Sequence, residues 1–338
     1  MRYIREIMVL LKDPAGESVK DIYQMQKTLA QEGLKVRIGA AAEWEATLPE
    51  QKEMGFDHEE RSAGREAIYK DDTAEGRLWF VDCEKAALLL QQKKVPVVVY
   101  LHEENRNCRF EAASYAAERP GELTADYFDL VYRRFLGIPW EITQTQRCLI
   151  RETVPEDARA FAGIYSDPEI TRYTEGFGVA QTRKDAAEDP VAVSSKDKSV
   201  DALPEEEYIR RYIKKVYEFY GYGIWTVLLK DTGKVIGRVG FQNFAEEVPE
   251  GNEKYAHYPQ LGYMIASPYQ KKGLATEVCK AARTYANDQL FFEGVQIFVH
   301  KENKASIRLA EKLGFCWMKQ EVQAADGKMI LHGILEFD

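Results

Sequence analysis

The stretch that decides the fold runs from Leu261 to Ala286 and reads LGYMIASPYQKKGLATEVCKAARTYA. It opens as a strand, turns at Gln270–Ala275 and continues as a helix whose small and apolar residues recur at helical spacing. The first turn of a helix presents unpaired N–H groups and the positive end of the macrodipole, and small residues there let a phosphate approach the backbone. The stretch therefore predicts an anion-binding turn, and an ordinary strand-to-helix turn is the alternative.

A second helix with its own signature follows after one more strand. It reads NKASIRLAEKLGF from Asn303 to Phe315, and Gly314 is placed to end it as a C-cap. The order of strand, anion-binding turn, helix, strand and Asn-x-x-Ser helix resembles the GNAT N-acetyltransferase superfamily, and within it the branch that acetylates ribosomal-protein N-termini and other amines. The resemblance covers about Cys148 to the C-terminus and implies a mixed α/β GNAT fold for residues 147–338.

The resemblance implies that acetyl-CoA is the acyl donor, and it assigns roles to residues of both motifs. The turn would hold the CoA pyrophosphate, the strand edge would pair with the pantetheine amides, and the second helix would bind the pantetheine arm near the thioester. The residues concerned are Tyr263, Met264 and Ile265 on the strand, Gln270, Lys271, Lys272, Gly273, Leu274, Ala275 and Thr276 in the turn, and Asn303 and Ser306 in the second helix.

The expected reaction is direct attack of a primary amine on the thioester in a ternary complex, which needs a proton acceptor for the amine and a partner for the leaving thiolate. The family often has a Glu where this chain has Gln260, and a Tyr where it has Ala310. Ser306 is then the candidate partner of the thiolate. Glu253, His257 and Tyr258, just before Gln260, are candidate bases, and the ordinary pKa of a histidine suits that role. A surface histidine without a role in the reaction is the alternative.

These departures leave two function classes open. The first is an acetyl-CoA-dependent N-acetyltransferase that acts on a peptide or protein N-terminus or on a small-molecule amine. The second is a non-catalytic acyl-CoA-binding sensor, because both of the usual catalytic positions are changed. Release of the CoA thiol in the presence of an amine separates the two classes, since a sensor binds CoA without turnover.

The charge balance narrows the range of partners. The chain has 338 residues, with 46 Lys and Arg against 55 Asp and Glu and a formal net charge of −9, so no overall basic field attracts nucleic acid or an anionic membrane. No apolar run approaches the roughly 20 residues that span a bilayer. The N-terminal residues lack a signal-peptide cleavage site, so we expect a cytoplasmic protein. A homodimer is compatible with the sequence.

Five cysteines are irregularly spaced along the chain. They are Cys83, Cys108, Cys148, Cys279 and Cys316. Their odd number and wide spacing fit neither a disulfide framework nor a metal-binding knuckle. We therefore expect reduced, mostly buried thiols and no metal site.

Residues 1–140 predict a separate three-layer α/β domain with a mainly parallel sheet. Strand-like runs alternate with helical patterns there, and Val95–Leu101 (VPVVVYL) has the β-branched composition of a central strand covered on both faces. The later part of this domain faintly resembles haloacid-dehalogenase-like proteins. Hydrolysis is not expected, because Asp13 stands without the second Asp of their Asp-x-Asp motif. Residues 177–203 lose all periodicity and predict a mobile loop.

Polar residues of the N-terminal domain fall where predicted strands end. They are Asp82, His102, Glu103 and Glu104. Open α/β sheets bind ligands at the carboxyl ends of their strands, so a metal or amine site is one interpretation. Ordinary polar loop ends give the same pattern, and the role of the domain stays open between a ligand sensor, a dimerisation unit and a remnant.

Overall fold

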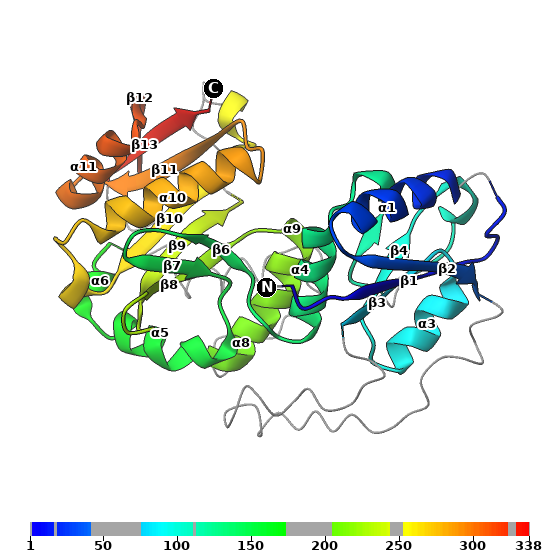
Figure 1. Cartoon of the computed structure of the whole chain (residues 1–338). Helices are drawn as coiled ribbons and strands as arrows, with labels where there is room; N and C mark the ends of the chain where they lie inside the picture. The colour runs from blue at the N-terminus through cyan, green and yellow to red at the C-terminus, as the bar shows by residue number, and fades with distance from the viewer. Residues whose placement is uncertain are drawn as a thin grey trace, which may run out of the picture. The chain divides into compact units, whose positions relative to one another are not determined.

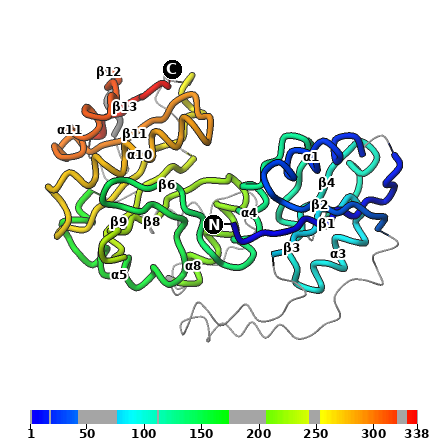
Figure 2. The backbone as a smooth tube through the Cα atoms, in the orientation of Figure 1, coloured from blue at the N-terminus to red at the C-terminus, as the bar shows by residue number. Residues whose placement is uncertain are grey.

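The computed structural model describes residues 2–16, 19–41, 76–110, 113–173, 205–243, 253–323 and 329–337. The chain divides into two compact units, Met1–Ile138 and Pro139–Asp338, whose course can be followed in Figures 1 and 2. The mobile loop predicted at residues 177–203 lies outside the described residues. Within the described part of the chain, no helix combines the length and the apolar character that crossing a bilayer requires.

The N-terminal unit is built on a five-stranded sheet in the order β2-β1-β3-β4-β5, in which every neighbouring pair is parallel. The strands are β1 (Glu6–Leu11), β2 (Lys35–Ala40), β3 (Arg77–Val81), β4 (Val97–Tyr100) and β5 (Ala116–Ala117). Helices α1 (Val19–Gln31) and α4 (Ala125–Phe135) belong to one apolar cluster and α3 (Glu84–Gln92) to another. The predicted three-layer α/β arrangement is confirmed.

Strand alternation explains the two clusters. Successive side chains of a strand point to opposite faces of the sheet, so Ile7 and Val9 of β1 join the cluster of α1 and α4, while Met8 and Leu10 join that of α3. All six residues of β1 are buried, as a strand covered on both faces requires.

The C-terminal unit is built on an eight-stranded sheet in the order β12-β13-β11-β10-β9-β8-β7-β6. The strands are β6 (Glu141–Gln144), β7 (Cys148–Arg151), β8 (Ile224–Leu229), β9 (Val235–Gln242), β10 (Gln260–Ile265), β11 (Gly294–His300), β12 (Cys316–Gln323) and β13 (Met329–Glu336). Neighbours are antiparallel except β10 and β11, which are parallel. This sheet, with its helices, confirms the mixed α/β fold predicted for the C-terminal half.

Helices cover both faces of this sheet (Figure 1). On one face lie α10 (Leu274–Asp288) and α11 (Lys304–Leu313), and on the other lie α5 (Ala158–Tyr165), the single turn α6 (Pro168–Thr171) and α8 (Glu205–Tyr212), which continues through a π-turn into α9 (Glu218–Tyr220). The fully buried Trp225 of β8 meets Tyr285 of α10 edge-on at 5.5 Å between ring centroids. The guanidinium of Arg238 on β9 lies over Phe161 of α5 at 4.7 Å.

The sheet opens between β10 and β11. Strand β10 pairs with β9 from Gln260 to Ile265, and β11 pairs with β13 along its whole length. Between themselves, β10 and β11 share one register pair, Gln260 with Gln296. Beyond that pair the two strands diverge, so the edge of β10 at Tyr263–Ile265 has no strand partner on the β11 side.

The five cysteines, all of them among the described residues, form no disulfide. Cys148 and Cys279 are buried, Cys83 is half-buried, and Cys108 and Cys316 are exposed. The expectation that most are buried is therefore wrong, because Cys108 lies in a loop and Cys316 begins a strand at the sheet edge.

Candidate active site

A cavity of about 530 Å³ lies where β10 and β11 diverge. Its walls come from both strands, from the turn that precedes α10, from α11 and from residues 168–173, which contain α6 and are called the α6 segment. Every predicted acetyl-CoA residue except Lys272 lines it: Tyr263, Met264, Ile265, Gln270, Lys271, Gly273, Leu274, Ala275, Thr276, Asn303 and Ser306. The ammonium group of Lys272 lies instead 5.5 Å from the ring centroid of Tyr269.

The turn before α10 has an unusual backbone. Lys271 and Gly273 both adopt left-handed conformations, with φ of 59° and 78°, and Gly273 is the N-cap of α10. A helix leaves the N–H groups of its first turn without partners inside the helix, and here the residues of that turn, Leu274, Ala275 and Thr276, line the cavity. The turn can therefore offer backbone donors and a positive dipole end to an anion.

Arg147 fixes this turn from the outside. Its Nη1 donates to the carbonyl oxygen of Lys272 at 2.9 Å, and its Nε and Nη2 bind the Glu277 carboxylate at 2.7 and 2.6 Å. Burial acts to raise the pKa of Glu277, but hydrogen bonds from Thr145 and Arg147 and the charge of Arg147 outweigh it and keep that pKa below its ordinary value. Glu277 is thus an ionised support of the turn.

Asn303 and Ser306 are linked at the start of α11. The Oδ1 atom of Asn303 caps the helix by accepting from the Ser306 N–H at 3.1 Å, so the cap does not use the two Nδ2 donors of Asn303. The Ser306 hydroxyl oxygen in turn accepts from the Tyr263 hydroxyl at 2.7 Å. Burial raises the pKa of Tyr263 well above its ordinary value, so this phenol stays a neutral donor.

The other side of the cavity carries residues that sequence reasoning missed. Phe298 and His300 of β11 line it together with Glu169, Ile170 and Tyr173 of the α6 segment. The ring of Tyr173 lies 5.9 Å from that of His300. The signal that could have found His300 is its position at the end of a strand, three residues before Asn303.

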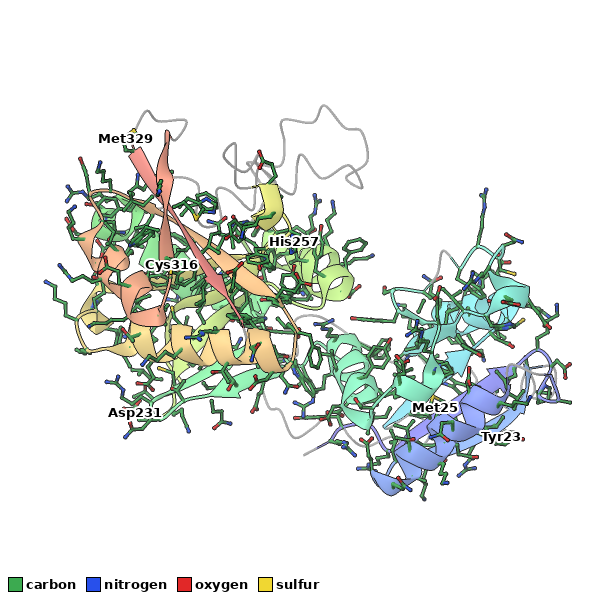
Figure 3. All side chains as sticks on the ribbon, turned by 90° about the horizontal axis from the view of Figure 1, so that it is seen from above. Tyr23, Met25, Asp231, His257, Cys316 and Met329 are labelled. Atoms are coloured by element: carbon green, nitrogen blue, oxygen red, sulfur yellow. The ribbon has the colours of Figure 1, made fainter. Side chains whose placement is uncertain are left out.

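The predicted bases lie away from these walls. Glu253 belongs to a short 3₁₀ turn, Glu253–Tyr255, and His257 is exposed beside the Glu293 carboxylate at 3.2 Å, as its label in Figure 3 helps to locate. Neither residue lines the cavity. Gln260 is buried, with its Oε1 3.5 Å from the Nε2 of Gln242, so the position of the family's Glu carries no proton acceptor.

Comparison with known proteins places this arrangement in a family. The family model described as acetyltransferase (GNAT) domain matches residues 147–316. The chain belongs to the GNAT acetyltransferase family. As a GNAT protein it is an acetyltransferase, and the fold and family predicted from the two motifs are confirmed.

Relatives of this GNAT protein match slightly more than half of its length. The uncharacterized N-acetyltransferase YoaA of Bacillus subtilis (strain 168) is 26% identical over 174 residues, which are 52% of this chain and 82% of YoaA. The uncharacterized N-acetyltransferase p20 of Bacillus licheniformis is 25% identical over 195 residues, 56% of this chain and 92% of p20.

Solved structures also match more than half of the chain. A GNAT-family acetyltransferase from Bacillus anthracis is 17% identical and has a TM-score of 0.40, covering 57% of this chain and 96% of its own. The ribosomal-protein-S5-alanine acetyltransferase from Vibrio fischeri is 15% identical and has a TM-score of 0.41, covering 59% of this chain and 96% of its own.

The N-terminal unit of this GNAT protein lies outside the family match, and its haloacid-dehalogenase resemblance stays a prediction. Its strand ends bring Asp82 and His102 together, with 3.5 Å between Oδ2 and Nε2. Burial raises the pKa of Asp82, although the Lys12 N–H and His102 oppose the rise. Among the residues that the structure describes, no three His, Cys, Asp or Glu side chains are arranged to hold a metal ion.

Proposed function

We propose that the protein transfers the acetyl group of acetyl-CoA to a primary amine, by direct attack of the amine in a ternary complex. The observation that carries the proposal is the cavity at the divergence of β10 and β11, which joins an anion-binding turn to proton-bearing side chains. The acetyl donor supplies an activated thioester, and the chain supplies position, hydrogen bonds and a path for the proton.

We assign the binding of acetyl-CoA to the turn before α10, to the edge of β10 and to Asn303, and we call these residues the donor side of the cavity. The amides from Lys271 to Thr276 bind the CoA pyrophosphate, and the positive end of α10 favours its charge. The strand edge at Tyr263–Ile265 offers backbone groups to the pantetheine amides, because no strand pairs with it there. The Nδ2 donors of Asn303 bind the pantetheine arm from the opposite wall.

Ser306 is assigned to the leaving thiolate. Its hydroxyl oxygen already accepts a hydrogen bond from Tyr263 at 2.7 Å, so its own proton is free to point into the cavity toward sulfur. A hydroxyl that accepts one hydrogen bond is polarised and becomes a better donor. The Tyr263–Ser306 pair thus takes the place of the tyrosine that the family often has at the position of Ala310, which is fully buried here.

The non-catalytic acyl-CoA sensor stays the second candidate. It is favoured by the buried amide at Gln260, where the family often has a carboxylate. A sensor and an enzyme bind acetyl-CoA with the same residues. They differ in whether the side of the cavity that receives the amine, here called the acceptor side, can accept the amine proton.

Calorimetry with acetyl-CoA, followed by thiol release in the same sample, tests the proposal. The acceptors are peptides with Ala, Ser or Met at the N-terminus, spermidine and kanamycin, with ethylamine at high concentration as a generic amine. Binding followed by thiol release that depends on one class of amine supports the enzyme and identifies its acceptor. Binding without release from any amine favours the sensor, and absence of binding refutes the assignment of the turn.

A further inference from the structure

His300 is the last residue of β11 and lies in the wall of the cavity. Only 8% of its surface is exposed, and its Nδ1 atom has no hydrogen-bond partner among the residues that the structure describes. A buried polar atom without a partner costs free energy in a folded protein. An incoming group with a proton to donate would remove that cost.

Strand alternation decides which side of the cavity His300 faces. On β11 it shares a face with Phe298, whose ring stacks on His332 at 4.4 Å. On β10, Tyr263 points to the opposite face, where it reaches Ser306 of α11. The histidine and the serine therefore lie on opposite faces of the sheet at the gap between the strands. This arrangement suits a ternary complex in which the thioester of acetyl-CoA lies in the gap, with Ser306 near its sulfur and the amine arriving from the face of His300.

We propose that Nδ1 of His300 accepts the amine proton during acetyl transfer, an inference that rests on the function proposed above. The lone pair of the amine nitrogen attacks the thioester carbonyl carbon of acetyl-CoA and forms the C–N bond. The C–S bond breaks, and its electron pair leaves on sulfur as a thiolate that accepts a hydrogen bond from Ser306. The nitrogen gives one proton to Nδ1, which later releases it to solvent, and the thiolate takes its proton from solvent.

The titratable group in printed contact with His300 is Tyr173, whose ring lies 5.9 Å away and has Arg172 over it. Lys301 follows His300 in the chain, and His332 of β13 stacks on Phe298 of the same face. The cavity wall also contains Glu169 and, from the opposite face of the sheet, Arg308 and Lys312 of α11. None of them is hydrogen-bonded to Nδ1. An imidazole exchanges protons near neutral pH, so it suits general-base work in a site whose usual carboxylate position is an amide.

The test uses the full-length protein, acetyl-CoA and the fastest amine of the panel described above, or ethylamine if no other reacts. We expect His300→Gln to lower kcat by about 10²- to 10⁴-fold and to leave the Kd for CoA within about twofold. Imidazole in the buffer restores part of the rate of His300→Ala. Glu302→Gln is the matched control, because Glu302 is exposed in the same loop and lies outside the cavity wall.

The pH profile supplies the second readout. A general base contributes to the pH profile of kcat/KM, so the profile of His300→Gln should lose that contribution and keep the one due to the amine. The proposal is overturned if His300→Gln keeps the wild-type kcat and the wild-type pH profile of kcat/KM. It is also overturned if His257→Gln, and not His300→Gln, loses them. A rate loss in His300→Ala that imidazole does not restore assigns His300 a structural role. A wild type that acetylates no amine, ethylamine included, overturns the proposed function itself.

Discussion

Replacement of Gly273 by Ala tests the turn before α10 most directly. Gly273 has φ of 78° and ψ of −1°, a left-handed conformation that costs a residue with a Cβ about 1–2 kcal/mol. A Cβ there would meet Nη2 of Arg147 at 3.6 Å, an ordinary contact, so the variant has room to fold. We expect a loss of about 1–2 kcal/mol in the free energy of unfolding, or about 2–8 °C in Tm.

The effect on CoA binding should exceed the effect on stability. A hydrogen bond to a charged group contributes about 1.5–3 kcal/mol, so relaxation of the strained turn that misaligns one pyrophosphate contact weakens binding by about 10- to 100-fold. The assay is calorimetric titration with CoA at fixed ionic strength. Thermal unfolding of the same sample separates the binding effect from loss of folded protein.

Gly314→Ala is the matched control. Gly314 also has a left-handed φ, 94°, and its added Cβ would meet Cδ1 of Leu335 at the same 3.6 Å. It ends α11 rather than beginning α10 and lies outside the cavity wall. We expect a similar loss of stability with unchanged CoA affinity. Wild-type affinity in Gly273→Ala, or equal weakening in both variants, would refute the reasoning.

Three further outcomes follow from contacts in the C-terminal unit. Tyr263→Phe removes the hydrogen bond to Ser306 and should lower kcat by up to about 10-fold while the KM for acetyl-CoA stays within about twofold, as thiol-release kinetics will show. Burial lowers the pKa of His332 to about 4, so its contribution to stability is complete above the unfolded pKa of 6.5 and is lost as the pH falls toward 4. Because His332 has no exposed surface, urea titrations should record about 2–3 kcal/mol of this loss, absent in His332→Gln. Burial raises the pKa of the Cys279 thiol, so iodoacetamide should label Cys316, which is exposed, long before Cys279, as mass spectrometry of peptides can measure.

Each of these has a contrary result. A Tyr263→Phe enzyme with full kcat contradicts the role of the Tyr263–Ser306 pair in holding the thiolate. Equal pH dependence in wild type and His332→Gln shows that other groups carry the acid sensitivity. Rapid labelling of Cys279 in the native protein means that α10 opens enough to expose its buried face.

The sequence predicted most of the residues that line the cavity at the turn and at the start of α11, because a turn and a helix cap depend on short-range pattern. The turn Gln270–Ala275 and the cap at Asn303 combine backbone geometry with nearby side chains, and a helix start has the same chemistry wherever it lies in a fold. Even so, Lys272 lies over Tyr269 instead of in the cavity wall, because the direction of a long side chain depends on what packs beside it.

The candidate proton acceptor on the acceptor side of the cavity could not be predicted from such short-range patterns. The residues nearest to Gln260 in the sequence, Glu253 and His257, supplied the predicted bases, and the structure places both away from the cavity. His300 lies 40 positions after Gln260. It belongs to β11, which pairs with β10 only at Gln260 and Gln296 and then diverges from it. Which side chains meet across a gap between parallel strands depends on strand order and register, and neither is a local property.

The sequence by itself determined the α/β fold class and the GNAT family of the C-terminal half, because hydrophobic periodicity and helix-start signals depend on neighbouring residues. The tertiary structure alone decided that Tyr263 donates to Ser306 across 43 positions and that Arg147 supports the turn through Glu277. It also decided that His300 lines the cavity and that its Nδ1 has no partner within the described part of the chain. Proton transfer acts over a few ångströms, and such distances between remote residues are set only when the sheet assembles.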